Sequence, residues 1–160
     1  MYIDLYPYFE AIAAQGLGMI LRDSIWMFPV IECVHLLALA MLGGAVMIVD
    51  FRLLGFGLSG KPLREVAESM QPWLKRSLIT ILVTGVLLFM SEAVKCYYSP
   101  PFWYKMGFLA TAIIFTFSIK KRVLATDEAA LGPIKGRVIA LLSLGLWFGV
   151  GFSGRWIAFY

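Results

Sequence analysis

Two ionisable residues stand inside stretches that are otherwise apolar, and they are the first candidates for chemistry. His35, the only histidine of the chain, lies about eleven residues into such a stretch, and Glu32 precedes it by three residues. In a helix the two side chains share a face, and Gly43 further along leaves a gap against which a flat ring could lie. A neutral imidazole can bind haem iron or another metal ion. His35 is therefore a candidate cofactor and metal ligand, although an imidazole bonded to Glu32 or to a neighbouring helix fits the sequence as well.

Lys105 is the second such residue, within the segment FWYKMGFL. A charge at mid-membrane costs roughly 2.5–3.5 kcal/mol, so its presence needs a reason. Its ammonium could extend to the membrane surface among the aromatic residues, or it could face the bundle as a counter-charge or ligand. The candidate cofactor-binding residues are thus His35, Lys105, Glu32 and Gly43.

The elements that position these residues follow from the composition. Of the 160 residues, 61% are hydrophobic and 15% charged, against roughly a quarter charged in soluble domains. A helix needs about 20 apolar residues to cross a bilayer. Four segments meet this length, at about 25–49, 77–94, 102–119 and 138–154. We expect an all-α membrane protein, a single domain over 1–160 that forms a bundle of four transmembrane helices.

The segments between the spans have their own patterns. The first 20 residues are amphipathic but broken, which predicts an interfacial helix on the membrane surface. A second short interfacial helix is expected from Lys61, ended by Pro72. Small residues four apart, Ala40 with Gly44 and Gly145 with Gly149, favour close helix packing.

The distribution of basic residues predicts the orientation. Ten of the fourteen lie in the loops after the first and third spans: Arg52, Lys61, Arg64, Lys75, Arg76, Lys120, Lys121, Arg122, Lys135 and Arg137. Basic loops stay on the cytoplasmic side. Both termini are therefore expected outside the bacterial inner membrane, with His35, Lys105 and Glu32 in the outer half.

Other polar and sulfur-containing residues have simpler interpretations. Asp50 and Arg52 are expected to form a local ion pair at the inner end of the first span. Cys33 and Cys96 are expected to be buried thiols, which could form a disulfide only if both lie near the outer face. Met106 could contribute to a copper site, but a packing role fits it better.

Two segments resemble known families. HLLALAMLGGAVMIVDFRLLG, from His35 to Gly55, and PPFWYKMGFLATAIIF around Lys105 are similar to segments of the small-membrane-protein type of protoporphyrinogen oxidase, a haem-b-binding family. The pattern also resembles copper-resistance D type membrane domains and an uncharacterised family of small bacterial four-helix membrane proteins. The first resemblance implies haem b, with His35 and Lys105 as the key residues.

The leading functional hypothesis is a haem-b-binding membrane protein for redox chemistry or electron transfer. It would exchange electrons with a quinone or a membrane redox partner, and whether it is an enzyme stays open. A metal (copper) handling or transport protein and a cofactor-free assembly subunit of a membrane complex are the alternatives. A homo-oligomer fits all three, and two histidine ligands to one haem would require a second subunit because the chain has one histidine.

Overall fold

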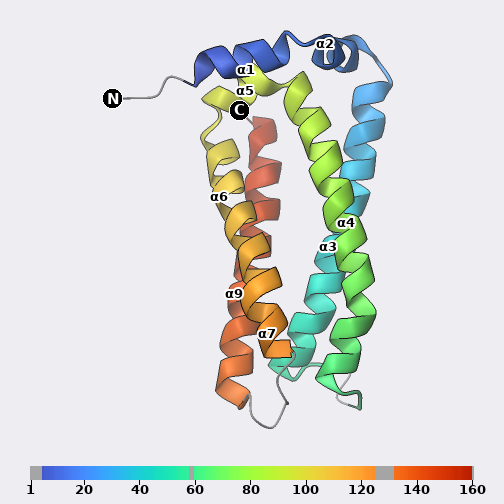
Figure 1. Ribbon diagram of the computed structural model, residues 1–160, viewed down its shortest axis with the longest axis vertical. Coiled ribbons are helices and arrows are strands. Elements are labelled where there is room, and N and C mark those ends of the chain that lie inside the picture. Colours follow the sequence, from blue (N-terminus) through green and yellow to red (C-terminus); the bar gives the residue numbers. More distant parts are fainter. Residues whose placement is uncertain (1–4, 58–59, 125–131, 160) are drawn as a thin grey trace.

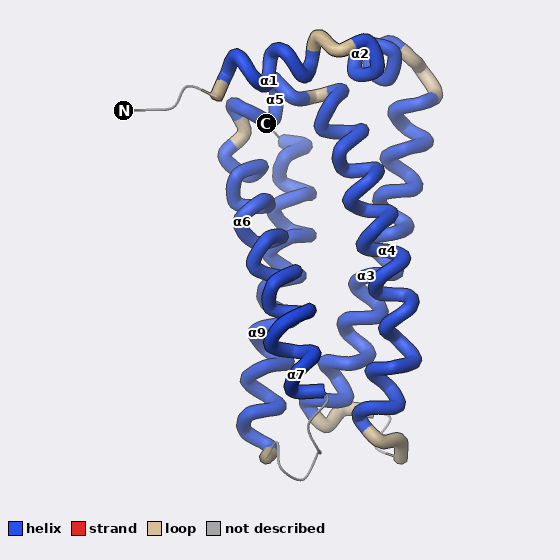
Figure 2. Tube along the Cα trace, viewed as in Figure 1, coloured by secondary structure: helices blue, strands red, loops and turns tan. Residues whose placement is uncertain are grey.

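The computed structural model describes residues 5–57, 60–124 and 132–159, and helices form nearly all of this part of the chain (Figures 1 and 2). Four segments are long and apolar enough to cross a membrane: Met27–Leu54, Leu63–Ser91, Pro100–Leu124 and Ile134–Phe159. The predicted four-span, all-α architecture is confirmed. In order, the helices are α1 (Tyr6–Ala13), α2 (Gly16–Asp23), α3 (Met27–Leu54), α4 (Leu63–Ser91), α5 (Ala93–Tyr98), α6 (Pro100–Ile114), the π-helix η1 (Phe115–Lys120), α7 (Lys121–Leu124), α9 (Pro133–Trp156) and the 3₁₀ turn η2 (Ile157–Phe159).

The four long helices stand side by side in two pairs (Figure 1). α3 packs along α4, α6 packs along α9, and α3 also packs along α9, whereas α4 and α6 have little close backbone contact. The side of the bundle between α4 and α6 is therefore its most loosely packed side. Both termini lie at one end, here called the terminal end, and the connections after α3 and α7 lie at the other, the loop end.

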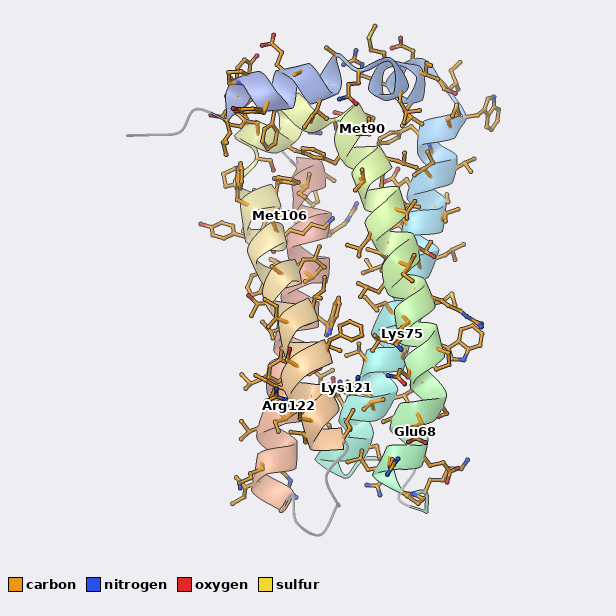
Figure 3. All side chains as sticks on the ribbon, viewed as in Figure 1. Glu68, Lys75, Met90, Met106, Lys121 and Arg122 are labelled. Carbon is orange, nitrogen blue, oxygen red and sulfur yellow. The ribbon has the colours of Figure 1, made fainter. Side chains whose placement is uncertain are left out.

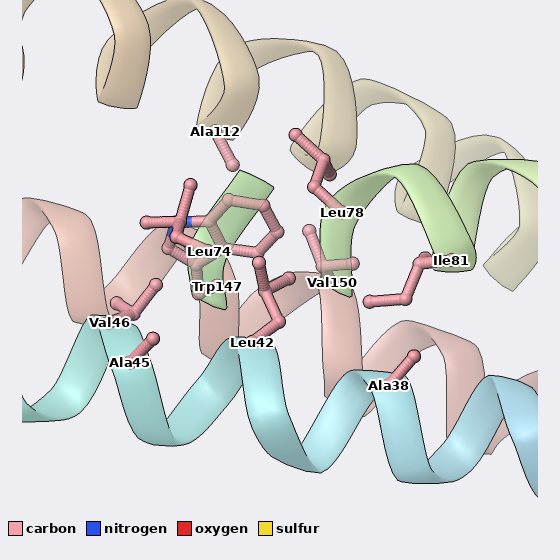
Figure 4. Packing of buried hydrophobic residues seen from close by; sticks show 10 residues of the cluster. All are labelled: Ala38, Leu42, Ala45, Val46, Leu74, Leu78, Ile81, Ala112, Trp147 and Val150. Carbon is pink, nitrogen blue, oxygen red and sulfur yellow. The ribbon is translucent and has the colours of Figure 1, made fainter. Parts of the chain in front are cut away.

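The core lies between the two helix pairs, about midway along the long helices, and it is almost entirely aliphatic (Figure 4). Its buried members are Ala38, Leu42, Ala45, Val46, Leu74, Leu78, Ile81, Ala112, Trp147 and Val150. In each span only 11–33% of the most apolar window is buried inside the protein. Since the remaining apolar side chains point outwards, lipid is the solvent that suits this surface.

The second span is longer than the sequence predicted, and the expected interfacial helix ended by Pro72 is wrong. α4 runs without a break from Leu63 to Ser91, with Pro72 inside it. Proline removes one backbone hydrogen bond and is costly in a helix interior. Here the apolar residues keep their helical spacing on both sides of Pro72, since Val66 and Leu74 are both buried on the same side of α4. Burial of this continuous stripe offsets the lost bond.

The other span boundaries also extend past the apolar segments. α3 continues to Leu54 and ends at Gly55, whose φ of +89° is the left-handed conformation that glycine adopts most easily. The Phe56 amide then donates to the Phe51 carbonyl at 2.8 Å, which caps the helix. At the terminal end, Pro100 and Pro101 start α6 rather than only separating two spans.

Two helices, rather than the one predicted, cover the terminal end. α1 lies against α5, and α2 lies against α4 (Figure 1). The ring of Phe9 packs edge-on against Phe89 of α4 and Tyr97 of α5, which fastens α1 to the bundle. α2 approaches α4 so closely that a Cβ at Gly18 would lie 2.6 Å from the Met90 carbonyl oxygen. Only glycine permits this contact.

Candidate cofactor site at the terminal end

His35 lies in the terminal-end half of α3 and is fixed by α4. Its Nδ1 lies 2.8 Å from Oγ1 of Thr84. The single hydroxyl proton of Thr84 is already directed to the Thr80 carbonyl oxygen, 2.6 Å away. Thr84 can therefore only accept at Nδ1, so the imidazole carries its proton on Nδ1 and donates it to Thr84. This tautomer leaves the Nε2 lone pair available, which is the form that binds a metal ion or haem iron.

Gly85 of α4 lies beside the imidazole ring, at ordinary van der Waals distance. A Cβ at this position would lie 3.4 Å from Cε1 of His35 and 4.0 Å from Nδ1. The ring edge therefore rests on the α4 backbone beside Thr84. Thr84 and Gly85 were not predicted as site residues, although their adjacent positions on one helix are what orient His35.

Lys105 enters the same region from α6. Its side chain runs along α9, where Cε and Nζ both lie 3.5 Å from the position of a Cβ on Gly154. The ammonium interacts electrostatically with His35 and with the thiol of Cys96. Within the described part of the chain, no hydrogen bond or ion pair reaches Nζ of Lys105. The fold thus places His35 and Lys105 within electrostatic reach of each other, and no described residue pairs with the ammonium.

Glu32 and Gly43 are placed differently. Glu32 is exposed on α3, and Thr84 rather than Glu32 is the hydrogen-bond partner of His35. Gly43 lies two turns from His35, and a Cβ there would have nothing within 4 Å. Open space does exist at Gly43, but it lies nearer the middle of the bundle than the His35–Lys105 pair.

The cysteines and the two methionines Met90 and Met106 lie on four different helices, α3, α5, α4 and α6. No group of three or more histidine, cysteine or acidic residues gathers among the described residues. Both cysteines are free thiols, and Cys96 is buried in α5 as expected. The expectation that Cys33 is buried is wrong, because it lies on an exposed face of α3. Met90 and Met106 lie on different helices, α4 and α6 (Figure 3). Burial, with a smaller contribution from Glu92, raises the pKa of Cys96 to about 11 against the lowering effect of Lys105. Cys96 is thus a neutral thiol and a poor ligand at neutral pH.

A second polar centre lies at the loop end, and it corrects the predicted pairing of Asp50 with Arg52. Asp50 Oδ1 lies 2.6 Å from Nζ of Lys120, with both side chains almost fully buried. Lys120 also donates to Oγ of Ser143 at 3.0 Å. Arg52 instead donates to the Lys61 carbonyl oxygen from Nε and Nη2, at 3.1 and 2.9 Å. Residues two apart on a helix point to different sides, so the side chains of Asp50 and Arg52 are not neighbours on the surface of α3.

The π-helix η1 explains how Lys120 reaches the interior. Lys120 was expected in a basic loop, but only 2% of it is exposed. It is the last residue of η1, whereas Lys121, the next residue, is exposed. The wider π turn shifts the register of the helix and directs Lys120 inwards. Asp50 could have been recognised from sequence, because it continues the buried stripe of Ala38, Leu42 and Val46 on α3.

Comparisons with known proteins give a family but no activity. No curated protein and no solved structure matches the chain. The comparisons do not connect it to copper-resistance D type domains or to the small-membrane-protein type of protoporphyrinogen oxidase. One family model matches residues 8–160, which is nearly the whole sequence. The chain therefore belongs to DUF6644, a family of unknown function.

Proposed function

We propose that the protein binds haem b in the terminal-end half of the bundle and serves in membrane redox chemistry or electron transfer. The observation that carries this proposal is the 2.8 Å contact between Nδ1 of His35 and Oγ1 of Thr84. With the Thr84 proton given to the Thr80 carbonyl, this contact favours a proton on Nδ1 and leaves Nε2 free. Ligating histidines are usually oriented by such a hydrogen bond on the opposite ring nitrogen. Bound haem would supply one-electron transfer.

The residues around His35 fit such a group in charge as well as in ligand type. Lys105 brings a half-buried ammonium that no described residue pairs, and an unpaired charge in an apolar region is disfavoured. A haem propionate would pair that charge, or the lysine would act as a second axial ligand. The loosely packed side between α4 and α6 is where a flat group would enter with the least disturbance of helix contacts. A second axial histidine would have to come from another copy of the chain, in a homo-oligomer.

The charge distribution supports an orientation with both termini outside the bacterial inner membrane. Ten basic residues were predicted in the two loops at the loop end, and Lys120 was one of them. Since Lys120 is buried in the bundle, nine remain. That excess still favours the loop end on the cytoplasmic side. The haem would then lie in the outer half of the membrane, where it would exchange electrons with a quinone or a membrane redox partner.

The test is a pair of visible spectra, oxidised and dithionite-reduced, of the protein purified in mild detergent. We expect a Soret band with reduced α and β bands, which His35→Ala abolishes and added imidazole partly restores. Thr84→Val should retain haem but shift its reduction potential, because Nδ1 loses its acceptor. Thr84→Ser keeps the hydroxyl and is the matched control, with an unchanged potential expected.

A protein that stays colourless after incubation with haem would refute the proposal. Metal bound without porphyrin would then favour metal handling. A stable partner that co-purifies with colourless protein would favour an assembly subunit.

A further inference from the structure

A pocket of about 240 Å³ opens at the loop end, far from His35, between α4 and the η1–α7 segment. Its apolar wall includes Val49 of α3, Leu74 of α4 and Phe117 of η1. Its polar wall includes Arg64 at the start of α4 and the two consecutive lysines Lys120 and Lys121. Figure 3 shows Lys121 and Glu68 on facing helices at this end of the bundle. The pocket thus joins an apolar surface to a basic one.

Lys120 lies between the pocket and the buried ion pair. Its Nζ is held by Asp50 and Ser143, at 2.6 and 3.0 Å. Since neither of these residues lines the pocket and Lys120 is almost fully buried, its ammonium is committed to the interior of the bundle. The basic group that remains for a ligand is Lys121, which lines the pocket and is exposed.

The charge of the pocket favours an anion. Arg64 is paired with Glu68 through a 2.7 Å contact between Nε and Oε1, and Lys120 is paired with Asp50. Among the described residues, no carboxylate pairs with Lys121, so its positive charge is in excess at the pocket. The basic residues of the loop end add a wider positive potential.

We propose that this pocket binds the phosphate headgroup of an anionic membrane lipid. Lys121 donates to the phosphate oxygens, and the acyl chains follow the apolar wall past Leu74 and Phe117. The pocket lies where α4 passes from charged residues such as Arg64 to apolar ones such as Leu78, which is the depth of lipid headgroups. Basic pockets between transmembrane helices suit anionic headgroups, whereas a water-soluble anion would not need the apolar wall.

The experiment is a native mass spectrometry titration of the detergent-purified protein with phosphatidylglycerol and with phosphatidylcholine. We expect tighter binding of phosphatidylglycerol, and a loss of about tenfold in its affinity in Lys121→Gln, as expected for one charged hydrogen bond. Lys75→Gln removes the same charge from an exposed position of α4 outside the pocket and should change the affinity less than about twofold.

A second variant tests the pocket without changing any charge. Ala67 is half-buried in the pocket wall, and Ala67→Leu should fill the space and weaken phosphatidylglycerol binding to a similar degree. Equal losses in Lys75→Gln and Lys121→Gln would mean diffuse attraction to a basic surface and would overturn the proposal. Displacement of the lipid by an equal concentration of inorganic phosphate would assign the pocket to a soluble phosphate compound and would overturn it too.

Discussion

Removal of one partner of the buried ion pair should destabilise the protein far more than removal of both. Asp50 is 0% exposed and Lys120 2% exposed, and their charged atoms lie 2.6 Å apart. With an effective dielectric constant of about 20, the attraction between them is about 6 kcal/mol. Most of this attraction offsets the free-energy cost of taking both charges out of water. A single neutral substitution leaves the other charge buried and unpaired, which costs roughly 3–5 kcal/mol.

A double-mutant cycle measures this coupling. Asp50→Asn and Lys120→Met nearly preserve side-chain volume, and each should lower the free energy of unfolding by about 3 kcal/mol or more. The double variant should lie closer to the wild type than either single variant, because it contains neither buried charge. Reversible unfolding in mixed micelles, followed by tryptophan fluorescence, provides the four free energies.

An exposed ion pair at the same end of the bundle is the matched control. Lys61 and Glu65 lie four residues apart with a contact of 3.3 Å, and their side chains are 60% and 58% exposed. The cycle of Lys61→Met with Glu65→Gln should give a coupling below about 0.5 kcal/mol. Additive effects of the Asp50 and Lys120 substitutions, with a coupling no larger than in this control, would refute the reasoning.

Two further predictions concern α9 and the terminal end. Gly149→Ala should destabilise the bundle by about 1–3 kcal/mol, because its Cβ would lie 2.8 Å from the ring of Phe108. Gly145→Ala has no atom within 4 Å of its Cβ and should be neutral or stabilising by up to about 1 kcal/mol in the same unfolding assay; equal effects of the two would contradict the packing. Cys96 should react slowly with a maleimide at pH 8 and faster as the pH approaches its pKa of about 11, with Cys96→Ala as the control. Since the unfolded thiol ionises at about 9.0, this burial should stabilise the native state below pH 9 and cease to do so as the pH rises through 11; fast labelling at pH 8 would contradict this assignment.

The four spans could be predicted from the sequence alone, because each apolar segment is long enough to cross a bilayer and its side chains suit lipid. The sequence also placed His35 and Lys105 in the same half of the bundle, since both lie near the terminal ends of their helices. The predicted helix ends were less accurate, because α4 begins at Leu63, well before the predicted residue 77. The first turns of α4 contain charged residues, which hide the row of buried apolar residues that continues on both sides of Pro72.

The partners of polar side chains on neighbouring helices could not be predicted without the tertiary structure. Helical spacing suggested Glu32 for His35 and Arg52 for Asp50, but the observed partners are Thr84 and Lys120, which are distant in sequence. Local spacing specifies which residues share a helix face, and it carries no information on which neighbouring helix meets that face. The inward turn of Lys120 depends in addition on one π turn, a small change of backbone register that hydrophobic periodicity does not reveal.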